Sequence, residues 1–204
     1  MIPSITHHAH AVDLLVGLDA PRGADAAARL LDAWKPVDAL GSVDPTAAAL
    51  AAQLEAVLRR FAPPKPSARP DRSIWQCTIR TYPDSSPPSD DHFRALGRRI
   101  LHATGIAPEG DEHACRWAAL RTAPHELRLI APLMRADGRV PDTSAARPLA
   151  LAVCQLDERH QQEYPFRAGA ARTSSPHLTH AGVARTHQDP GRSAIAPALS
   201  RRTP

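Results

Sequence analysis

The chain contains few aromatic residues and almost no lysine. Aromatic residues make up 4% of its 204 residues, and the hydrophobic fraction of 43% is ordinary only because alanine is abundant. A chain of this length can still form one domain with a hydrophobic core. Lysine occurs only at Lys35 and Lys65, so arginine carries nearly all of the positive charge. The net charge of +4 permits a nucleic-acid partner but does not require one.

Long apolar runs are absent as well. No run approaches the roughly 20 residues that a membrane-spanning helix needs, and the N-terminus lacks the basic and apolar segments of a signal peptide. The three cysteines, Cys77, Cys115 and Cys154, are odd in number and widely spaced, which matches neither a disulfide framework nor a zinc site. We therefore expect buried free thiols, a cytoplasmic location and no membrane partner.

Generic catalytic motifs are missing too. The sequence has no phosphate-binding loop, dinucleotide-binding glycine motif, nucleophile elbow, HExxH or CxxC. His7, His8 and His10 lie close together, but histidines in an N-terminal segment are more often solvated than bound to a metal. His113 and Cys115 have no partner at a metal-binding spacing. The residues alone therefore predict no metal site.

In the first third of the chain, apolar residues recur at helical spacing. Apolar residues over Ala24–Trp34 recur at helical intervals and stop before a proline. A second helix is predicted after Asp44, which can cap it, and its apolar stripe ends at Phe61. These patterns predict an N-terminal helical section over residues 1–62.

Proline-rich and basic segments flank the rest. Residues 63–72 form a proline-rich linker, and residues 165–204 have no apolar periodicity, which predicts a disordered basic tail. Between them, residues 73–164 alternate between strand and helix patterns. The predicted strands cover 74–82, 116–123 and 126–134, and the predicted helices cover 89–105 and 142–163, the last with helical spacing at Leu149, Ala152, Val153 and Leu156.

The most informative stretch runs from 116 to 139, with the sequence RWAALRTAPHELRLIAPLMRADGR. Pro124-His125 separates two strands, because proline cannot donate to a ladder of backbone hydrogen bonds. Side chains alternate along a strand, so the apolar ones face the core while Glu126 and Arg128 share the opposite face. Adjacent strands joined by a tight turn predict an antiparallel sheet, covered by amphipathic helices, in an α+β domain.

Three phrases within residues 100–139, ILHATGIAPEGD, RWAALR and LMRADGR, resemble the relaxase/mobilisation nuclease family of conjugative and mobilisable elements, in the form found in GC-rich bacteria. The order and spacing of segments match well over roughly residues 70–160. The early DLLVGL and the late PGRSAIAPALSR also lie where the family has its opening motif and a terminal basic segment. The resemblance implies a two-layer α+β domain with irregular, proline-rich flanks and a role in plasmid or integrative-element DNA transfer.

Relaxases of this family nick one DNA strand at an origin of transfer. A tyrosine near the N-terminus attacks the phosphodiester, and a histidine cluster holds a divalent cation over the scissile phosphate. The resemblance places the two alternating histidines at Glu126 and Arg128, the upstream histidine at Thr122, and a further histidine at Gln76. The nucleophile region, Asp13–Leu18, contains no tyrosine.

These replacements argue against the family's chemistry. Arginine cannot ligate a metal, and its fixed charge repels one. We therefore predict no metal cofactor and no standard catalytic residue. The hypothesis is an ion pair in which Arg128 supplies the positive charge and Glu126 holds its guanidinium in place.

Three interpretations remain open. The first is a catalytically inactive relaxase-like protein that at most binds single-stranded DNA at a transfer origin, with other mobilisation proteins as further partners. The second is an active nicking enzyme that uses Mg²⁺ or Mn²⁺ with His125, Glu126 and Tyr82. The third is a decayed or repurposed protein-interaction domain. In the first interpretation, the residues that contact DNA are Arg80, Arg116, Arg121, Arg128, Arg135 and Arg139.

Overall fold

The computed structural model describes residues 1–15, 18–19, 28–36, 40, 46–61 and 73–163, all within the compact unit Met1–Pro165. The predicted linker and tail lie outside the described residues. In chain order, the elements are β1 (Ile2–His8), the 3-10 helix η1 (Val12–Leu14), β2 (Arg29–Ala33), α1 (Ala47–Arg60), β3 (Ile74–Arg80), α2 (Asp90–Ala103), β4 (Ala118–Ala123), β5 (Glu126–Pro132) and α3 (Ala146–Glu163).

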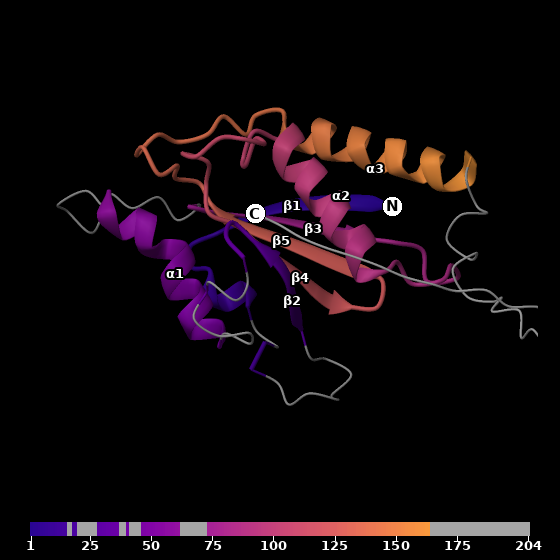
Figure 1. Ribbon diagram of the computed structural model, residues 1–204, viewed down its shortest axis with the longest axis horizontal. Coiled ribbons are helices and arrows are strands. Elements are labelled where there is room, and N and C mark those ends of the chain that lie inside the picture. The colour runs from indigo at the N-terminus through magenta and orange to yellow at the C-terminus, as the bar shows by residue number, and fades with distance from the viewer. Residues whose placement is uncertain (16–17, 20–27, 37–39, 41–45, 62–72, 164–204) are drawn as a thin grey trace, which may run out of the picture. The chain divides into compact units, whose positions relative to one another are not determined.

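The strands form one five-stranded sheet in the order β1-β3-β5-β4-β2 (Figure 1). Every neighbouring pair is antiparallel, which confirms the predicted α+β class with an antiparallel sheet. The predicted turn at Pro124-His125 joins β4 to β5. β5 therefore occupies the centre, with β3 on one side and β4 on the other.

The N-terminal residues belong to this sheet and not to a separate helical section. β1 pairs with β3 along its whole length, and β2 pairs with β4. The prediction of a helix over Ala24–Trp34 is wrong where that segment is described, because Arg29–Ala33 is a strand. A short apolar run fits either period, and the free edge of β4 supplies backbone hydrogen bonds that an isolated helix of this length lacks.

The predicted helices after residue 44 are present, with small shifts at their ends. Thr46 caps α1 by accepting a hydrogen bond from the backbone N–H of Ala49, whereas the predicted cap, Asp44, lies outside the described residues. Ser89 caps α2 as predicted, and Gly105 follows that helix in the left-handed region at φ 72°. None of the described helices combines the length and the apolar character that a membrane crossing requires.

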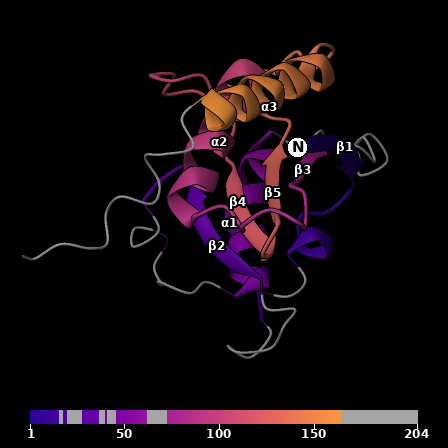
Figure 2. The same cartoon turned by 90° about the vertical axis from the view of Figure 1, so that its right-hand side faces the viewer.

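Helices cover both faces of the sheet. α2 and α3 lie next to each other over one face (Figures 1 and 2), where Trp75, Leu129 and Phe93 are fully buried. On the opposite face, α1 and η1 pack against the sheet around Leu50 and Leu120. The implied two-layer arrangement was therefore incomplete, because α1 adds a third layer over part of the second face.

The helix α3 packs against the sheet through its small residues. Ala150 and Cys154 are fully buried against the sheet side, whereas Leu149 and Leu156 are 39% and 49% exposed. The apolar spacing at these leucines favours a buried stripe, but the helix is rotated away from it. One reason is Asp157, which is 3% exposed and is held by ion pairs with residues of α2.

This orientation of α3 predicts unequal effects at neighbouring positions. Ala150→Glu places an unpaired charge in the core and is expected to lower the free energy of unfolding by about 3 kcal/mol or more. Leu149→Glu changes a half-exposed site and is expected to cost about 0.5 kcal/mol or less. Urea unfolding of the two variants tests which side of α3 is buried. An equal decrease in the free energy of unfolding of both variants would contradict the orientation described.

Candidate functional site

The two charged residues at the start of β5 lie on the face of the sheet that α1 and η1 cover. Leu127 and Leu129 belong to the hydrophobic cluster under α2 and α3. Because side chains alternate along a strand, Glu126 and Arg128 point to the opposite side. The Cα partners of Arg128 are Thr78 in β3 and a residue of β4, which places it in the middle of the sheet.

The carboxylate of Glu126 accepts hydrogen bonds from three strands. Thr122 Oγ1 donates to Oε1 at 2.6 Å from β4, and Arg80 Nε donates to Oε2 at 2.8 Å from β3. Arg128 Nη2 donates to Oε1 at 3.2 Å from β5 itself. The side chain of Glu126 is 15% exposed and that of Arg128 is 23% exposed. The predicted ion pair between Glu126 and Arg128 is therefore present, with two further donors that complete it.

A β-bulge positions Thr122 for this contact. The register of β4 against β5 shifts between Arg121 and Ala123, so that Thr122 is an extra residue opposite the ladder. A bulge of this kind re-aims a side chain and increases the local twist. The hydroxyl of Thr122 consequently reaches the Glu126 carboxylate across the hairpin.

The guanidinium of Arg128 also contacts the beginning of the chain. Its Nη1 donates to the backbone carbonyl of Leu14 at 3.1 Å, although the two residues are 114 positions apart. Leu14 belongs to η1 and lies within Asp13–Leu18, the segment where the resemblance predicts the nucleophile. No sequence pattern signals this contact, because it is made by a backbone carbonyl.

Gln76 takes part only indirectly. Its Nε2 donates to Thr78 Oγ1 at 2.8 Å, and Thr78 is the β3 residue opposite Arg128. Among the described residues, Gln76 Oε1 and Arg128 Nε are buried without a hydrogen-bond partner. Of the four positions that the resemblance predicts, the structure therefore joins Thr122, Glu126 and Arg128 directly and leaves Gln76 on the neighbouring strand, two residues from the position opposite Arg128.

The environment of Glu126 favours its ionised form. Burial by itself raises the pKa of the carboxyl, but the hydrogen bonds from Thr122 and Arg80 and the charges of Arg80 and Arg128 outweigh it. The pKa of Glu126 is consequently below its ordinary value of 4.5. A depressed pKa means that the carboxylate stabilises the fold above its ordinary pKa and loses this effect as the pH falls through the folded value.

A divalent metal does not fit these residues. Glu126 is the only carboxylate among the four positions, and each of its oxygens already accepts a hydrogen bond. Arg128 places a permanent positive charge within 3.2 Å of it. Elsewhere in the part of the chain that the structure describes, no group of three or more histidine, cysteine, aspartate or glutamate side chains could hold a metal ion.

Three of the arginines predicted to bind DNA are engaged within the protein. Arg116 donates to the backbone carbonyl of Gln53 and stacks over a tryptophan. Arg121 lies on the other face of the sheet, where it donates to Asp90 at 2.7 Å and stacks over a phenylalanine of α2. Arg135 makes a two-pronged ion pair with an aspartate at 2.6 and 3.1 Å.

The remaining arginines do not form one basic surface. The side chain of Arg80 is 65% exposed and lies at the Glu126 end of β5. Arg139 is exposed but follows the opposite end of that strand. A strand of seven residues spans about 20 Å. The structure therefore brings Arg80 and Arg128 together at Glu126 and keeps the other four predicted residues apart from them. The role of Arg80 as a partner of Glu126 follows from the β3–β5 register, which the sequence did not indicate.

The residues of the nuclease interpretation are only loosely arranged. His125 Nδ1 lies 3.0 Å from Thr81 Oγ1, and the two form a hydrogen bond. Tyr82 follows β3 with 59% of its surface exposed. Within the described residues, no hydrogen bond joins the side chains of Tyr82, His125 and Glu126. This end of the sheet therefore holds the predicted residues without a nucleophile–base pair.

Comparisons with protein-family models, with curated proteins and with solved structures find no match for the chain.

The Glu126 network predicts a pH-dependent loss of stability on mutation. Glu126→Gln leaves two guanidinium groups without their carboxylate and is expected to lower the free energy of unfolding at pH 7 by about 1–3 kcal/mol. The difference from the wild type should shrink as the pH falls from 4.5 through the lower pKa of the folded state, because the wild-type carboxyl is protonated over that range, first in the unfolded and then in the folded chain. Urea unfolding between pH 7 and pH 3 measures this.

A matched control for that measurement is Asp91→Asn. The Asp91 carboxylate pairs with Arg94 but is 92% exposed, so its removal should change stability by less than about 0.5 kcal/mol. A difference between Glu126→Gln and the wild type that stayed constant down to pH 3 would contradict the assigned role of the carboxylate.

Proposed function

We propose that the chain is a catalytically inactive, relaxase-like protein of plasmid or integrative-element DNA transfer that binds DNA weakly and does not cut it. The observation that carries the proposal is the contact between Arg128 and the backbone of Leu14. It joins the segment in the place of the family's nucleophile to a position in the place of its metal ligands. The resemblance implies such a meeting, because the tyrosine and the metal ion of the family act on the same scissile phosphate.

The same site supports the absence of nicking activity. The segment around Leu14 contains no tyrosine, so the covalent step lacks its nucleophile. Glu126 already accepts hydrogen bonds from Thr122, Arg80 and Arg128, and the two guanidinium charges oppose its use as a base or as a metal ligand. The network instead holds three strands and the opening segment together, which is a structural role in the place of a catalytic one.

DNA contact in this proposal depends on few side chains. Arg80 is the exposed arginine beside the Glu126 network, and a single phosphate contact contributes little on its own. We therefore expect weak binding that depends strongly on salt, as for a sequence-independent electrostatic contact.

Binding to a labelled single-stranded oligonucleotide, followed by fluorescence anisotropy from 50 to 200 mM salt, tests this. The affinity should fall as salt rises, and Arg80→Ala should reduce the slope of log K against log salt by about 0.7, the value for one phosphate contact on a single strand. Arg135→Ala is the matched control, because Arg135 is committed to its internal ion pair. The absence of binding at 50 mM salt, or a covalent protein–DNA adduct formed with Mg²⁺ or Mn²⁺, would contradict the proposal.

Histidine substitutions test whether these positions of the chain correspond to the metal-binding histidines of the family. The triple variant Thr122→His, Glu126→His and Arg128→His replaces side chains that already converge, and three imidazoles suit Zn²⁺. Calorimetry should detect one Zn²⁺ site per chain that the single variant Thr122→His lacks. If the folded triple variant bound no Zn²⁺, these positions would not converge as a metal-binding cluster and the correspondence would fail.

A further inference from the structure

The outer flank of α3 carries an apolar stripe, most of which is exposed in the described structure. Leu149, Ala152, Val153 and Leu156 recur at helical intervals, and three of them are exposed while Val153 is half-buried. Large exposed apolar side chains that share one side of a helix are typical of an interaction surface. The helix is anchored chiefly through Ala150 and Cys154, and Val153 of the stripe also packs against the core.

A groove of about 670 Å³ runs alongside this stripe. Val153 and Leu156 form its α3 side, Leu101 of α2 and Trp117 lie deeper, and the loop that contains Ala107 forms the other side. Most of its lining is apolar, so the groove extends the hydrophobic surface from α3 towards the neighbouring loop. Such a groove accepts leucine side chains from a partner helix.

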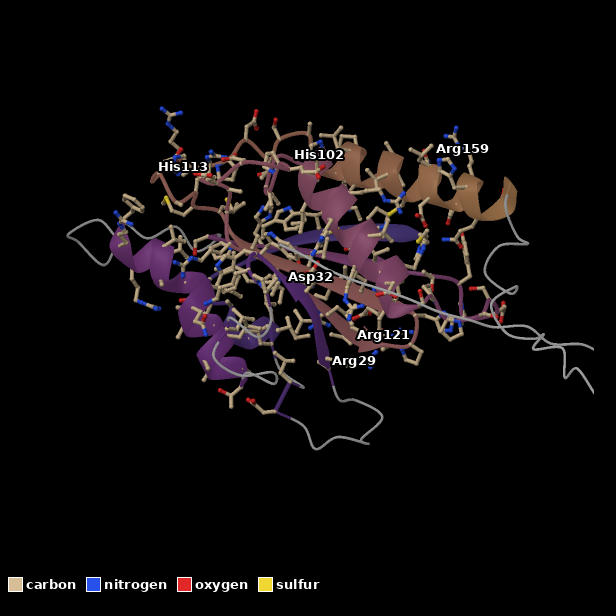
Figure 3. All side chains as sticks on the ribbon, in the orientation of Figure 1. Arg29, Asp32, His102, His113, Arg121 and Arg159 are labelled. Carbon is tan, nitrogen blue, oxygen red and sulfur yellow. The ribbon has the colours of Figure 1, made fainter. Side chains whose placement is uncertain are left out.

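Acidic residues border the groove, and basic residues follow the stripe. Glu109 and Glu112 are exposed on the loop that lines the groove. Arg159 is exposed one turn beyond Leu156 on α3. Figure 3 shows Arg159 near the C-terminal end of α3 and His102, the residue of α2 that leads into the acidic loop, near its N-terminal end. The two charges therefore lie at opposite ends of the same surface.

We propose that a second copy of the chain occupies this surface, with the two α3 helices antiparallel about a twofold axis. In that arrangement Leu149 of each copy lies beside Leu156 of the other, and Ala152 lies beside Val153, so that the small residue marks the crossing point. The same rotation brings Arg159 of each copy to the acidic loop of the other. A twofold interface requires such self-complementarity, because each patch must fit itself.

The self-complementary charges favour a second copy over an unrelated apolar partner. Arg98, which also borders the groove, is held mainly by Asp32 at 2.6 Å and interacts more weakly with Glu109, so the exposed carboxylates of Glu109 and Glu112 can accept an incoming cation. The surface is small, so we expect a weak dimer with a dissociation constant of about 1–100 μM.

Sedimentation equilibrium on the full 204-residue chain tests the proposal. The apparent mass should rise with concentration from 22.0 kDa towards twice that value. Leu149→Glu and Leu156→Glu should each weaken the association by about tenfold or more. Leu151→Glu is the matched control, because Leu151 is 41% exposed but lies on the other flank of α3. Circular dichroism confirms that each variant is folded.

A charge exchange tests the orientation of the two copies. Arg159→Glu should weaken the dimer by about threefold to tenfold, and adding Glu109→Arg and Glu112→Arg to it should recover the lost affinity. A chain that stays monomeric at about 200 μM, roughly twice the upper end of the expected range, would overturn the proposal. Equal weakening by Leu151→Glu and Leu156→Glu, or no recovery on charge exchange, would overturn this interface.

Discussion

The pairing of β3 with β5 is the constraint on which the rest of the structure depends. The two strands are in register over seven residues, from Ile74 opposite Pro132 to Arg80 opposite Glu126. This register places fully buried residues such as Cys77 and Leu129 on one face, where α2 and α3 cover them. It also aligns the polar residues on the other face. A shift by one residue would exchange the two faces and remove both the core and the Glu126 network.

The Glu126 network shows how a sheet can carry charge near its centre. A half-buried carboxylate is costly unless donors satisfy it, and here Thr122, Arg80 and Arg128 do so from three strands. The guanidinium of Arg128 also donates a hydrogen bond to the backbone carbonyl of Leu14, which holds the opening segment against the sheet. A cluster of this kind holds three strands and the opening segment together.

Several arginines are likewise held by carboxylates within the protein. Arg98, Arg121 and Arg135 each form an ion pair with an aspartate, and these pairs join loops and helices to the sheet. Such arginines are committed to the fold before any partner arrives. Along α3 an apolar surface stays exposed, because the helix packs through Ala150 and Cys154 and turns its leucines outward.

The sequence by itself determined the β4–β5 hairpin, the opposition of Leu127 to Glu126, the cap of α2 at Ser89 and the pairing of Glu126 with Arg128. These features depend on residues close together in the chain, where proline, capping side chains and strand alternation act locally. Only the tertiary structure decided that Arg29–Ala33 is a strand, which side of α3 is buried, and that Arg128 meets Leu14. A short apolar segment fits either a helix or a strand until a sheet edge offers it hydrogen bonds. The orientation of a helix is likewise decided by which side chains its neighbours accommodate, and that depends on residues far away in sequence.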